Sequence, residues 1–254
     1  ERTAYPRFGR VVTARELEVF YSVGEEEASL ARSTVRTPNH LLALAVSLKC
    51  FQRLHYFPPI EAVPEAIVNH VRQCLRLDVT VSAAYDRIKT MYRHQQLVRE
   101  WLEIEPYYGS QRARRIAASA ALRASEVLDD PVDIVNATIG ELQRERVELP
   151  AYSTLDRLAE RAHAVADRRL FGRVARLVSA EQRHVLNRLL VVTSDERLSG
   201  FQALKSSAKN ATLSHLDELL SHLRWLESLG DIDGALHTAA DAVQSWPVGD
   251  LFHK

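Results

Sequence analysis

The sequence is poor in the residues that make turns, crosslinks and membrane spans. Its 254 residues include only nine Gly, nine Pro and two Cys. No run approaches the roughly 20 apolar residues of a membrane-spanning helix, and the N-terminus lacks the apolar core of a signal peptide. Cys50 and Cys74 lie far apart, which excludes a disulfide framework and a CxxC metal site. We therefore expect a protein of the reducing cytoplasm, with no membrane partner.

The chain also has no net charge, because its 33 basic and 33 acidic side chains cancel. With 46% apolar residues, this balance excludes a disordered chain and a uniformly basic, histone-like protein. Glu1 is the first residue and Met91 is the only methionine, so we expect a piece of a longer or processed protein.

Apolar residues recur at spacings of three and four almost throughout, whereas strict alternation over a strand length is rare. The sequence therefore predicts an all-α fold of consecutive small helical bundles. Thr13 and Glu16 are spaced as a capping box, and Asp130 and Ser153 are expected helix starts. The expected helices cover residues 13–21, 25–33, 38–55, 64–77, 82–104, 110–128, 131–146, 153–170 and 180–192.

A Pro-Tyr-Tyr-Gly cluster at residues 106–109 interrupts the periodic pattern and marks a domain boundary. We predict a first domain over residues 1–105, a second over 106–178, and the start of a further helical region over 179–254. Charge follows this division in part. Residues 157–188 hold eight Arg against three acids, whereas residues 195–254 hold five basic against nine acidic side chains. A basic middle and an acidic tail suit a polyanion-binding part joined to a part with another role.

The helix expected over residues 153–169 sorts its side chains by face. Its predicted core stripe is Leu155, Leu158, Ala162 and Val165. Its second stripe is Thr154, Arg157, Arg161, Ala164 and Arg168. Arg157 and Arg161 are a like-charge i, i+4 pair, and such a pair destabilises a helix by about 0.2 to 0.5 kcal/mol. DNA phosphates would neutralise the two charges.

This helix and the one expected over residues 131–146 form a helix-turn-helix-like layout with a long connector. In such a unit the first residues of the second helix contact base edges in the major groove, here Ser153, Thr154 and Arg157. Phosphate contacts would then fall to Arg161, Arg168 and Arg169. The alternative is a solvated helix face with ordinary surface arginines.

Further basic side chains are candidates for DNA contact. The helix expected over residues 82–104 has a predicted core stripe of Ile88, Met91, Gln95, Val98 and Leu102. Beside that stripe, near Tyr85 and Tyr92, the candidates are Arg87, Lys89, Arg93 and His94. The others are Arg7, Arg10 and a cluster next to the Gly109 loop, Arg112, Arg114 and Arg115. The alternative is that these aromatic residues pack and these cations only give solubility.

Catalytic and metal-binding motifs are absent from the sequence. It contains no phosphate-binding Gly loop, nucleophile elbow or HExxH motif, so we predict no catalytic residue and no metal ligand. His215, Glu218 and His222 share a helix face, but the spacing supplies no fourth ligand. Leucines dominate that helix, which favours packing against a neighbouring domain or a second subunit.

Several sequence strings together resemble a known family. They are YPRF at 5–8, TARELEVFY at 13–21, LKCFQRLHYFP at 48–58, YDRIKTMYRHQ at 85–95, ELPAYSTLDRLAERA at 148–162 and LSGFQALK at 198–205. In this order and spacing they resemble the N-terminal region of class II replicative transposases, the large DDE enzymes of the ampicillin-transposon type. One departure is His55, where the resemblance leads us to expect Gly before Tyr-Phe-Pro.

The resemblance implies that successive helical domains bind the terminal inverted repeats of a transposon as double-stranded DNA. It further implies that residues 179–254 begin a dimerisation region, with a homodimer and the rest of the transposase chain as partners. The Asp, Asp and Glu metal ligands of the family belong to a separate catalytic domain, so this chain needs no cofactor and Mg²⁺ is expected only there. A bacterial, nucleoid-associated location is implied as well. The competing hypothesis is a helical protein-interaction scaffold without sequence-specific DNA binding.

Overall fold

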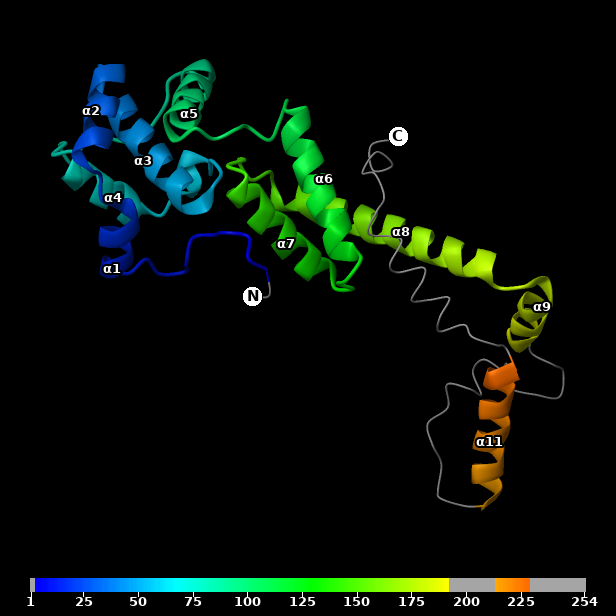
Figure 1. The fold of residues 1–254 in the computed structure, drawn as a ribbon. Helices are drawn as coiled ribbons and strands as arrows, with labels where there is room; N and C mark the ends of the chain where they lie inside the picture. The colour runs from blue at the N-terminus through cyan, green and yellow to red at the C-terminus, as the bar shows by residue number, and fades with distance from the viewer. Residues whose placement is uncertain (1–2, 192–212, 229–254) are drawn as a thin grey trace. The chain divides into compact units, whose positions relative to one another are not determined.

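The computed structural model describes residues 3–191 and 213–228, and most of these residues are helical (Figure 1). The predicted all-α fold is confirmed: within the described ranges the only β-type pairing is an isolated bridge between Glu105 and Val147. The chain divides into two compact units between His163 and Ala164. The domain limits predicted after residues 105 and 178 stay predictions.

The first helices follow the sequence expectations closely. They are α1 (Ala14–Glu16), the π-helical turn η1 (Leu17–Tyr21), α2 (Glu25–Thr34), α3 (Pro38–Leu54), the 3-10 turn η2 (Ile60–Ala62), α4 (Glu65–Cys74) and α5 (Ile88–Leu102). The capping box is confirmed, because the Thr13 hydroxyl accepts from the Glu16 N–H and the Glu16 carboxylate accepts from the Thr13 N–H. Helix α5 begins six residues later than expected, since Arg87 before it has an extended backbone.

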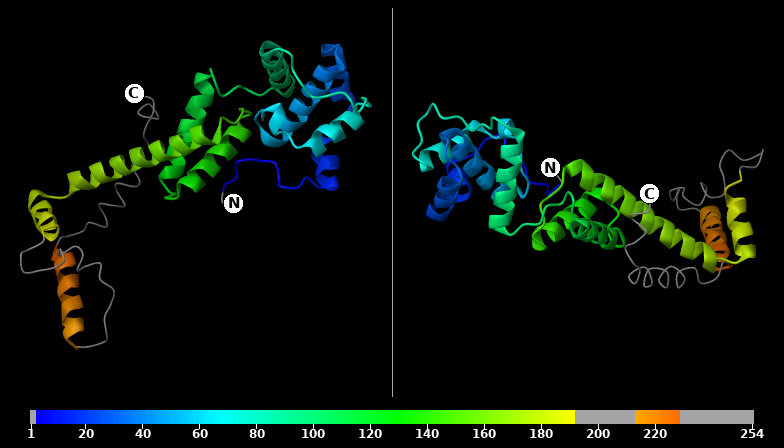
Figure 2. Two further views of the ribbon diagram at one scale, coloured as in Figure 1. Left: turned by 180° about the vertical axis from the view of Figure 1, so that it is seen from behind. Right: turned by 90° about the horizontal axis from the view of Figure 1, so that it is seen from above.

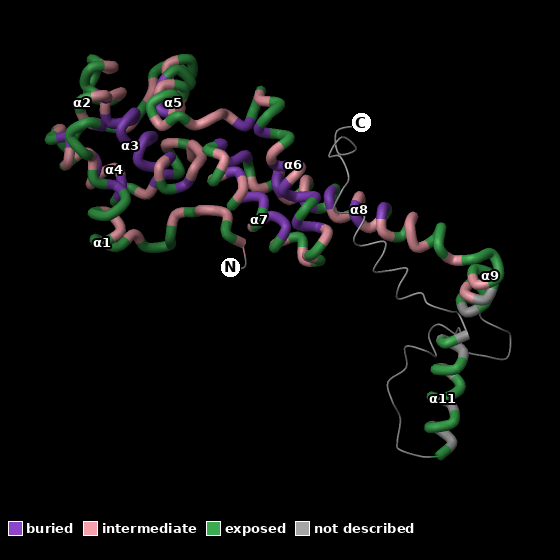
Figure 3. Tube along the Cα trace, viewed as in Figure 1, coloured by how far each residue is buried: buried purple, intermediate pink, exposed green. Residues whose placement is uncertain are grey.

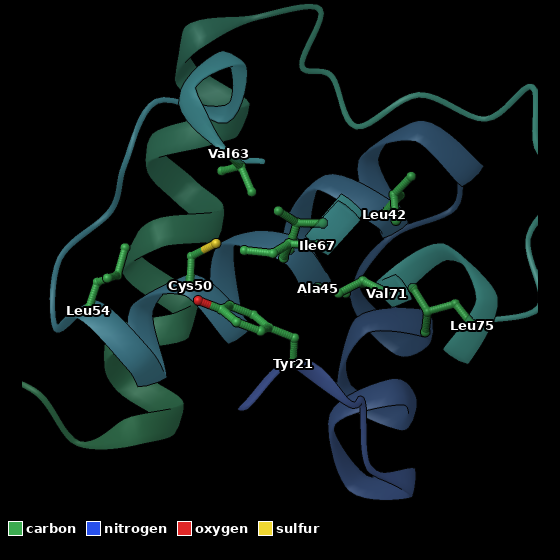
Figure 4. Close-up of a cluster of buried hydrophobic side chains, with 10 residues drawn as sticks. Tyr21, Leu42, Ala45, Cys50, Leu54, Val63, Ile67, Val71 and Leu75 are labelled. Carbon is green, nitrogen blue, oxygen red and sulfur yellow. The ribbon is translucent and has the colours of Figure 1, made fainter. Parts of the chain in front are cut away.

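Helix α3 is the centre of this first group, and its middle turns are buried on every side. One apolar cluster joins it to η1 and α4, with Tyr21, Cys50 and Ile67 at its middle (Figure 4). A second cluster joins α3 to α2 and α5 through Ala31, Phe51 and Val98. Burial raises the pKa of the Cys50 thiol to about 12, so this cysteine is a packing residue.

A buried polar group accompanies these clusters. The Lys49 ammonium lies 3.0 Å from one carboxylate oxygen of Glu27, and the Gln52 amide donates to the same oxygen over 2.8 Å. The second Glu27 oxygen accepts from the Gly24 N–H at the start of α2. The buried charges are therefore paired and hydrogen-bonded, which is the condition for keeping them inside a core.

Helix α3 ends at His55, which adopts the left-handed conformation with φ 60°. Its N–H donates to the Phe51 carbonyl over 2.7 Å. This is the cap geometry that Gly favours, and the chain retains it with a histidine in place of the expected Gly.

Helices α6 (Gln111–Ser125) and α7 (Pro131–Arg144) lie side by side in each view (Figure 2). The buried face of α6 consists mainly of alanines, including Ala113, Ala117 and Ala121, which let the two backbones approach closely. The Asp130 carboxylate caps α7 by accepting from the Val132 N–H, as predicted. The first turns of the next helix, α8 (Tyr152–Leu177), are also partly buried (Figure 3).

Beyond residue 163 the structure describes the rest of α8, then α9 (Ala180–Leu189) and α11 (Leu213–Ser228). Ser179 caps α9 in a capping box with Gln182. On α11, Leu213, Leu216, Leu219, Leu220 and Leu223 are exposed. The side chains of His215, Glu218 and His222, and the LSGFQALK string at 198–205, lie outside the described residues. Across the part of the chain that is described, no helix is both long and apolar enough to span a membrane.

Candidate nucleic-acid interface

The connector between α7 and α8, residues 145–151, is held in place by backbone hydrogen bonds to other segments. The Arg146 carbonyl accepts from the Glu105 N–H over 2.9 Å, and the Glu105 carbonyl accepts from the Glu148 N–H over 2.9 Å. The next N–H, of Leu149, donates to the His55 carbonyl over 2.8 Å. The connector therefore has one defined path, because two segments far away in sequence hold it.

Side chains fix the same connector. The Arg99 guanidinium lies 2.8 Å from the Glu148 carboxylate, and the Tyr5 hydroxyl donates to the Pro150 carbonyl over 3.0 Å. The Ala151 N–H donates to the Tyr108 hydroxyl over 3.3 Å. Since Ala151 directly precedes α8, these contacts set the position and direction of the helix start.

The first turns of α8 have a buried apolar side and an exposed basic side. Leu155 and Ala162 are buried as predicted, Ala159 is buried between them, and Leu158 is half-buried. Arg157 and Arg161 lie on the exposed side. The exposed side also holds Ser153, and Thr154 is half-buried at its edge. The predicted division of α8 into an apolar stripe and a basic stripe thus holds within residues 152–163.

Arg157 and Arg161 differ from most arginines near them. Neither guanidinium has a hydrogen bond or an ion pair to another residue that the structure describes. On α6 and α7, by contrast, Arg123 and Arg144 both pair with Glu141. Two exposed cations one turn apart, with no acid to neutralise them, attract a polyanion.

The extended segment before α1 meets the start of α8. Tyr5 stacks on Tyr56 with ring centroids 5.3 Å apart and meets the edge of Tyr152 at 5.7 Å. The Arg7 guanidinium lies 5.8 Å from the centre of the Tyr152 ring. Burial raises the pKa of Tyr5 well above its usual range. The structure thus brings Arg7 to the helix that carries Arg157, while Arg10 is exposed further along the segment.

Two arginines of the cluster after Gly109 make contacts within the protein, and the expectation that the cluster binds phosphate stays a prediction. Arg112 lies 2.6 Å from Glu105 and 2.8 Å from Glu145. The pKa of Glu105 is lowered, first by the Ser110 hydroxyl and then by Arg112. Arg114 donates to the Ser110 carbonyl over 3.2 Å, whereas Arg115 is exposed and without such a contact among the described residues.

Lys89 and Arg93 on α5 are exposed, as is Arg87 just before it, but the expectation that His94 joins this surface is wrong. His94 is 4% exposed, and its Nδ1 lies 3.2 Å from the Tyr85 hydroxyl. The predicted core stripe of α5 also shifts, because Ile88 is 63% exposed and His94 is buried instead. The extended chain before α5 causes this shift by placing Tyr85 against the helix.

The last two candidate arginines lie on α8 beyond residue 163. Arg168 is exposed, as expected for a phosphate contact. Arg169 is only 9% exposed, so the expectation that it lies on the open surface is wrong. Adjacent helix positions point about 100° apart, so only one of the two can lie on the basic stripe.

A family described as "Domain of unknown function (DUF4158)" matches residues 1–162. The chain belongs to the DUF4158 family. The matched residues include every contact described above for the α7–α8 connector and the first turns of α8.

The DUF4158 chain is also similar to the transposase for transposon Tn501 of Pseudomonas aeruginosa. The two are 23% identical over 207 residues, which are 81% of this chain and 21% of that transposase. This DUF4158 chain therefore spans about a fifth of the length of that curated relative, and its family is related to transposases.

Among the described residues of the DUF4158 chain, no group of three or more His, Cys, Asp or Glu side chains is arranged to hold a metal ion. Tyr5 and Tyr152, which position Arg7, were not singled out by the sequence analysis. The YPRF string contains Tyr5 and the string at 148–162 contains Tyr152, but the contact between these two residues, 147 positions apart, is not readable from a local pattern.

Proposed function

We propose that the first compact unit of this DUF4158 chain is the double-stranded-DNA-binding module of a transposase and recognises the terminal inverted repeats of its transposon. The observation that carries the proposal is the pair Arg157 and Arg161, exposed and without acidic partners on a helix whose start is fixed. The relation to a transposase supplies DNA as the polyanion.

In this proposal α7 and α8 act as a helix-turn-helix-like unit. The first turn of α8 lies in the major groove, where Ser153, Thr154 and Arg157 contact base edges. Arg161, one turn further, contacts phosphate. Because the connector is held to residues 55, 99, 105 and 108, a duplex on α8 would meet a preformed helix rather than one that must order on binding.

We further propose that the full-length protein is a class II replicative DDE transposase acting on bacterial DNA in the cytoplasm. Strand cleavage and Mg²⁺ binding would then belong to a catalytic domain outside these 254 residues. Arg87 just before α5, with Lys89 and Arg93 on it, would add phosphate contacts, and the acidic region after residue 194 would contact protein.

A second candidate function is a helical protein-interaction scaffold. The exposed leucines of α11, Leu213 to Leu223, favour it, since an apolar helix face usually packs against a partner. Under this hypothesis the arginines of α8 would pair with acidic side chains, and no DNA sequence would be preferred.

Fluorescence anisotropy with the chain and two labelled duplexes separates these functions. One duplex carries the terminal inverted repeat of the transposon that encodes the protein, and the other has the same bases shuffled. We expect a preference of about 10³-fold for the true end. If six to ten phosphates are contacted, affinity should fall by about 10³ to 10⁵ between 50 and 200 mM salt. Equal binding to both duplexes contradicts sequence recognition.

Substitutions assign the roles on α8. Arg157→Ala should weaken binding to the true end by roughly 5- to 150-fold and reduce the preference over the shuffled duplex. Arg161→Ala should weaken binding to both duplexes equally. Arg36→Ala, an exposed arginine between α2 and α3, is the matched control and should leave both affinities unchanged. Normal binding by both α8 variants would rule out this helix as the interface.

A further inference from the structure

The extended segment before α1 is anchored at both ends and at Phe8, and it is exposed between these anchors. At its start, the Tyr5 ring packs on Tyr56 and Tyr152, and the Tyr56 hydroxyl donates to the Pro6 carbonyl over 3.2 Å. Further along, Phe8 in the middle of the segment and Val12 at its far end pack against the apolar cluster around α3. Between and beside these anchors, the exposed residues are Arg7, Gly9, Arg10 and Val11.

The segment lies next to the proposed reading helix. Arg7 lies over Tyr152, the first residue of α8, at 5.8 Å. Arg157 is five positions further along α8, which is about 7.5 Å along the helix axis at 1.5 Å per residue. Arg157 also points about 140° around the helix from Tyr152, so Arg7 lies beside the first turn of α8 and not on the side of Arg157.

We propose that Arg7 and residues 9–11, on either side of the anchored Phe8, form an arm that contacts the DNA minor groove next to the base pairs read by α8. The proposal rests on the function proposed above and adds a second mode of sequence reading to it. An extended chain is narrow enough for a groove about 6 Å wide, whereas a helix is not. Arginine side chains favour the narrow minor groove of A·T-rich DNA, where the negative potential is strongest.

The composition of the segment fits this role. Gly9 separates the two arginines and has no side chain to hold the backbone away from the groove floor. A Cβ at this position would lie 3.2 Å from the Val11 carbonyl oxygen, so the present path of the segment favours glycine here. The anchors at Tyr5 and Val12 keep the arm beside α8, so its ordering is largely complete before DNA arrives.

Base analogues test the arm directly. An inosine·cytosine pair has the minor-groove pattern of A·T but the major-groove pattern of G·C, because it lacks the guanine 2-amino group. Each A·T pair of the terminal repeat is replaced in turn by I·C and by G·C. At pairs read by the arm, we expect I·C to bind like A·T, and G·C to bind about tenfold more weakly.

The variants then assign that preference to the arm. The double variant Arg7→Ala, Arg10→Ala should bind I·C and G·C duplexes equally at those positions, while keeping its preference for the true end over the shuffled duplex. Arg10→Ala alone should reduce the ratio of the I·C affinity to the G·C affinity at least twofold. This substitution removes no contact among the described residues, so we expect the variant to fold normally. Arg36→Ala is again the control.

The outcomes separate the two proposals. Equal affinity for I·C and G·C at every position in the wild-type chain would overturn the arm while leaving recognition by α8 intact. A preference for I·C over G·C that persists in the double variant Arg7→Ala, Arg10→Ala would also overturn the arm and leave recognition by α8 intact. Failure of the wild-type chain to prefer the true end over the shuffled duplex overturns the proposed function and the arm with it.

Discussion

Arg99 on α5 and Glu148 in the connector before α8 form an ion pair, with 2.8 Å between Arg99 Nε and Glu148 Oε2. Both side chains are largely buried, and the Arg99 guanidinium also lies 4.9 Å from the centre of the Phe57 ring. This contact ties the helices before the Gly109 loop to the helix that we propose reads DNA.

Removing either partner should destabilise the first compact unit. Arg99→Ala leaves a buried carboxylate without its cation, and we expect the free energy of unfolding to fall by about 3 to 5 kcal/mol. Arg123→Ala is the matched control, because its pair with Glu141 is exposed and should contribute about 0 to 1 kcal/mol. Urea denaturation of both variants measures the difference. Similar small losses in the two would mean that the buried pair does not hold the connector.

Arg112 and Arg115 should differ in their contribution to DNA binding, although they lie on the same helix and carry the same charge. Glu105 and Glu145 neutralise Arg112, whereas Arg115 has no such partner among the described residues. Arg115→Ala should reduce the slope of log affinity against log salt by about one if Arg115 contacts a phosphate. Arg112→Ala should leave that slope unchanged. A smaller slope for Arg112→Ala together with an unchanged slope for Arg115→Ala would show that DNA displaces Glu105 and Glu145 from Arg112.

The sequence predicted features that depend on neighbouring residues. Thr13 and Glu16, or Asp130 and Val132, are a few positions apart, so a capping pattern is readable directly. The apolar stripe of α8 was readable for the same reason, because helical periodicity is local. The same spacing predicted that the described residues would form helices and no strands.

The features that the sequence did not predict depend on distant partners. His94 looks like a surface residue until Tyr85 folds against it from an extended segment. Arg112 looks free until Glu145, 33 positions later, returns beside it. The contact of Tyr5 with Pro150 spans 145 positions. Each depends on tertiary packing, which no local periodicity encodes.

The same substitution should have opposite effects at two glycines. Gly109 has φ 90°, so an alanine there is strained even though no neighbouring atom lies within 4 Å of its Cβ. Gly109→Ala should lower the free energy of unfolding by about 1 kcal/mol. Gly140 is an exposed interior residue of α7 with open space around it, and Gly140→Ala should raise stability by about 0.5 to 1 kcal/mol. Thermal unfolding of the two variants measures both signs; equal shifts would contradict the left-handed geometry at Gly109.

The stability of the first compact unit should fall as the pH drops below about 7, in part because of His94. Burial lowers the pKa of His94 from its ordinary value of 6.5, and the nearby His40 and Arg93 lower it further. The folded state therefore keeps this imidazole neutral where the unfolded chain would protonate it. Below the unfolded pKa the unfolded state binds more protons, so its relative free energy falls as the solution becomes more acidic.

The groups around His94 define the comparison that tests this effect. Tyr85 Oη lies 3.2 Å from its ring nitrogen, and Asp86 lies 3.2 Å from His40, the second imidazole of the group. His94→Gln keeps a polar group beside Tyr85 but cannot be protonated. We expect this variant to be less stable than the wild type at pH 7.5, yet to lose less stability between pH 7 and pH 5 in urea denaturation.

His55→Gln serves as the comparison. Burial also lowers the pKa of His55, so His55 should make a separate and additive contribution to the loss of stability at acid pH. The carboxylates with lowered pKa, Glu16, Asp78 and Glu105, contribute only at lower pH, because the ordinary pKa is 3.8 for Asp and 4.5 for Glu. Identical pH dependence in the wild type and in His94→Gln would place the acid sensitivity elsewhere in the unit.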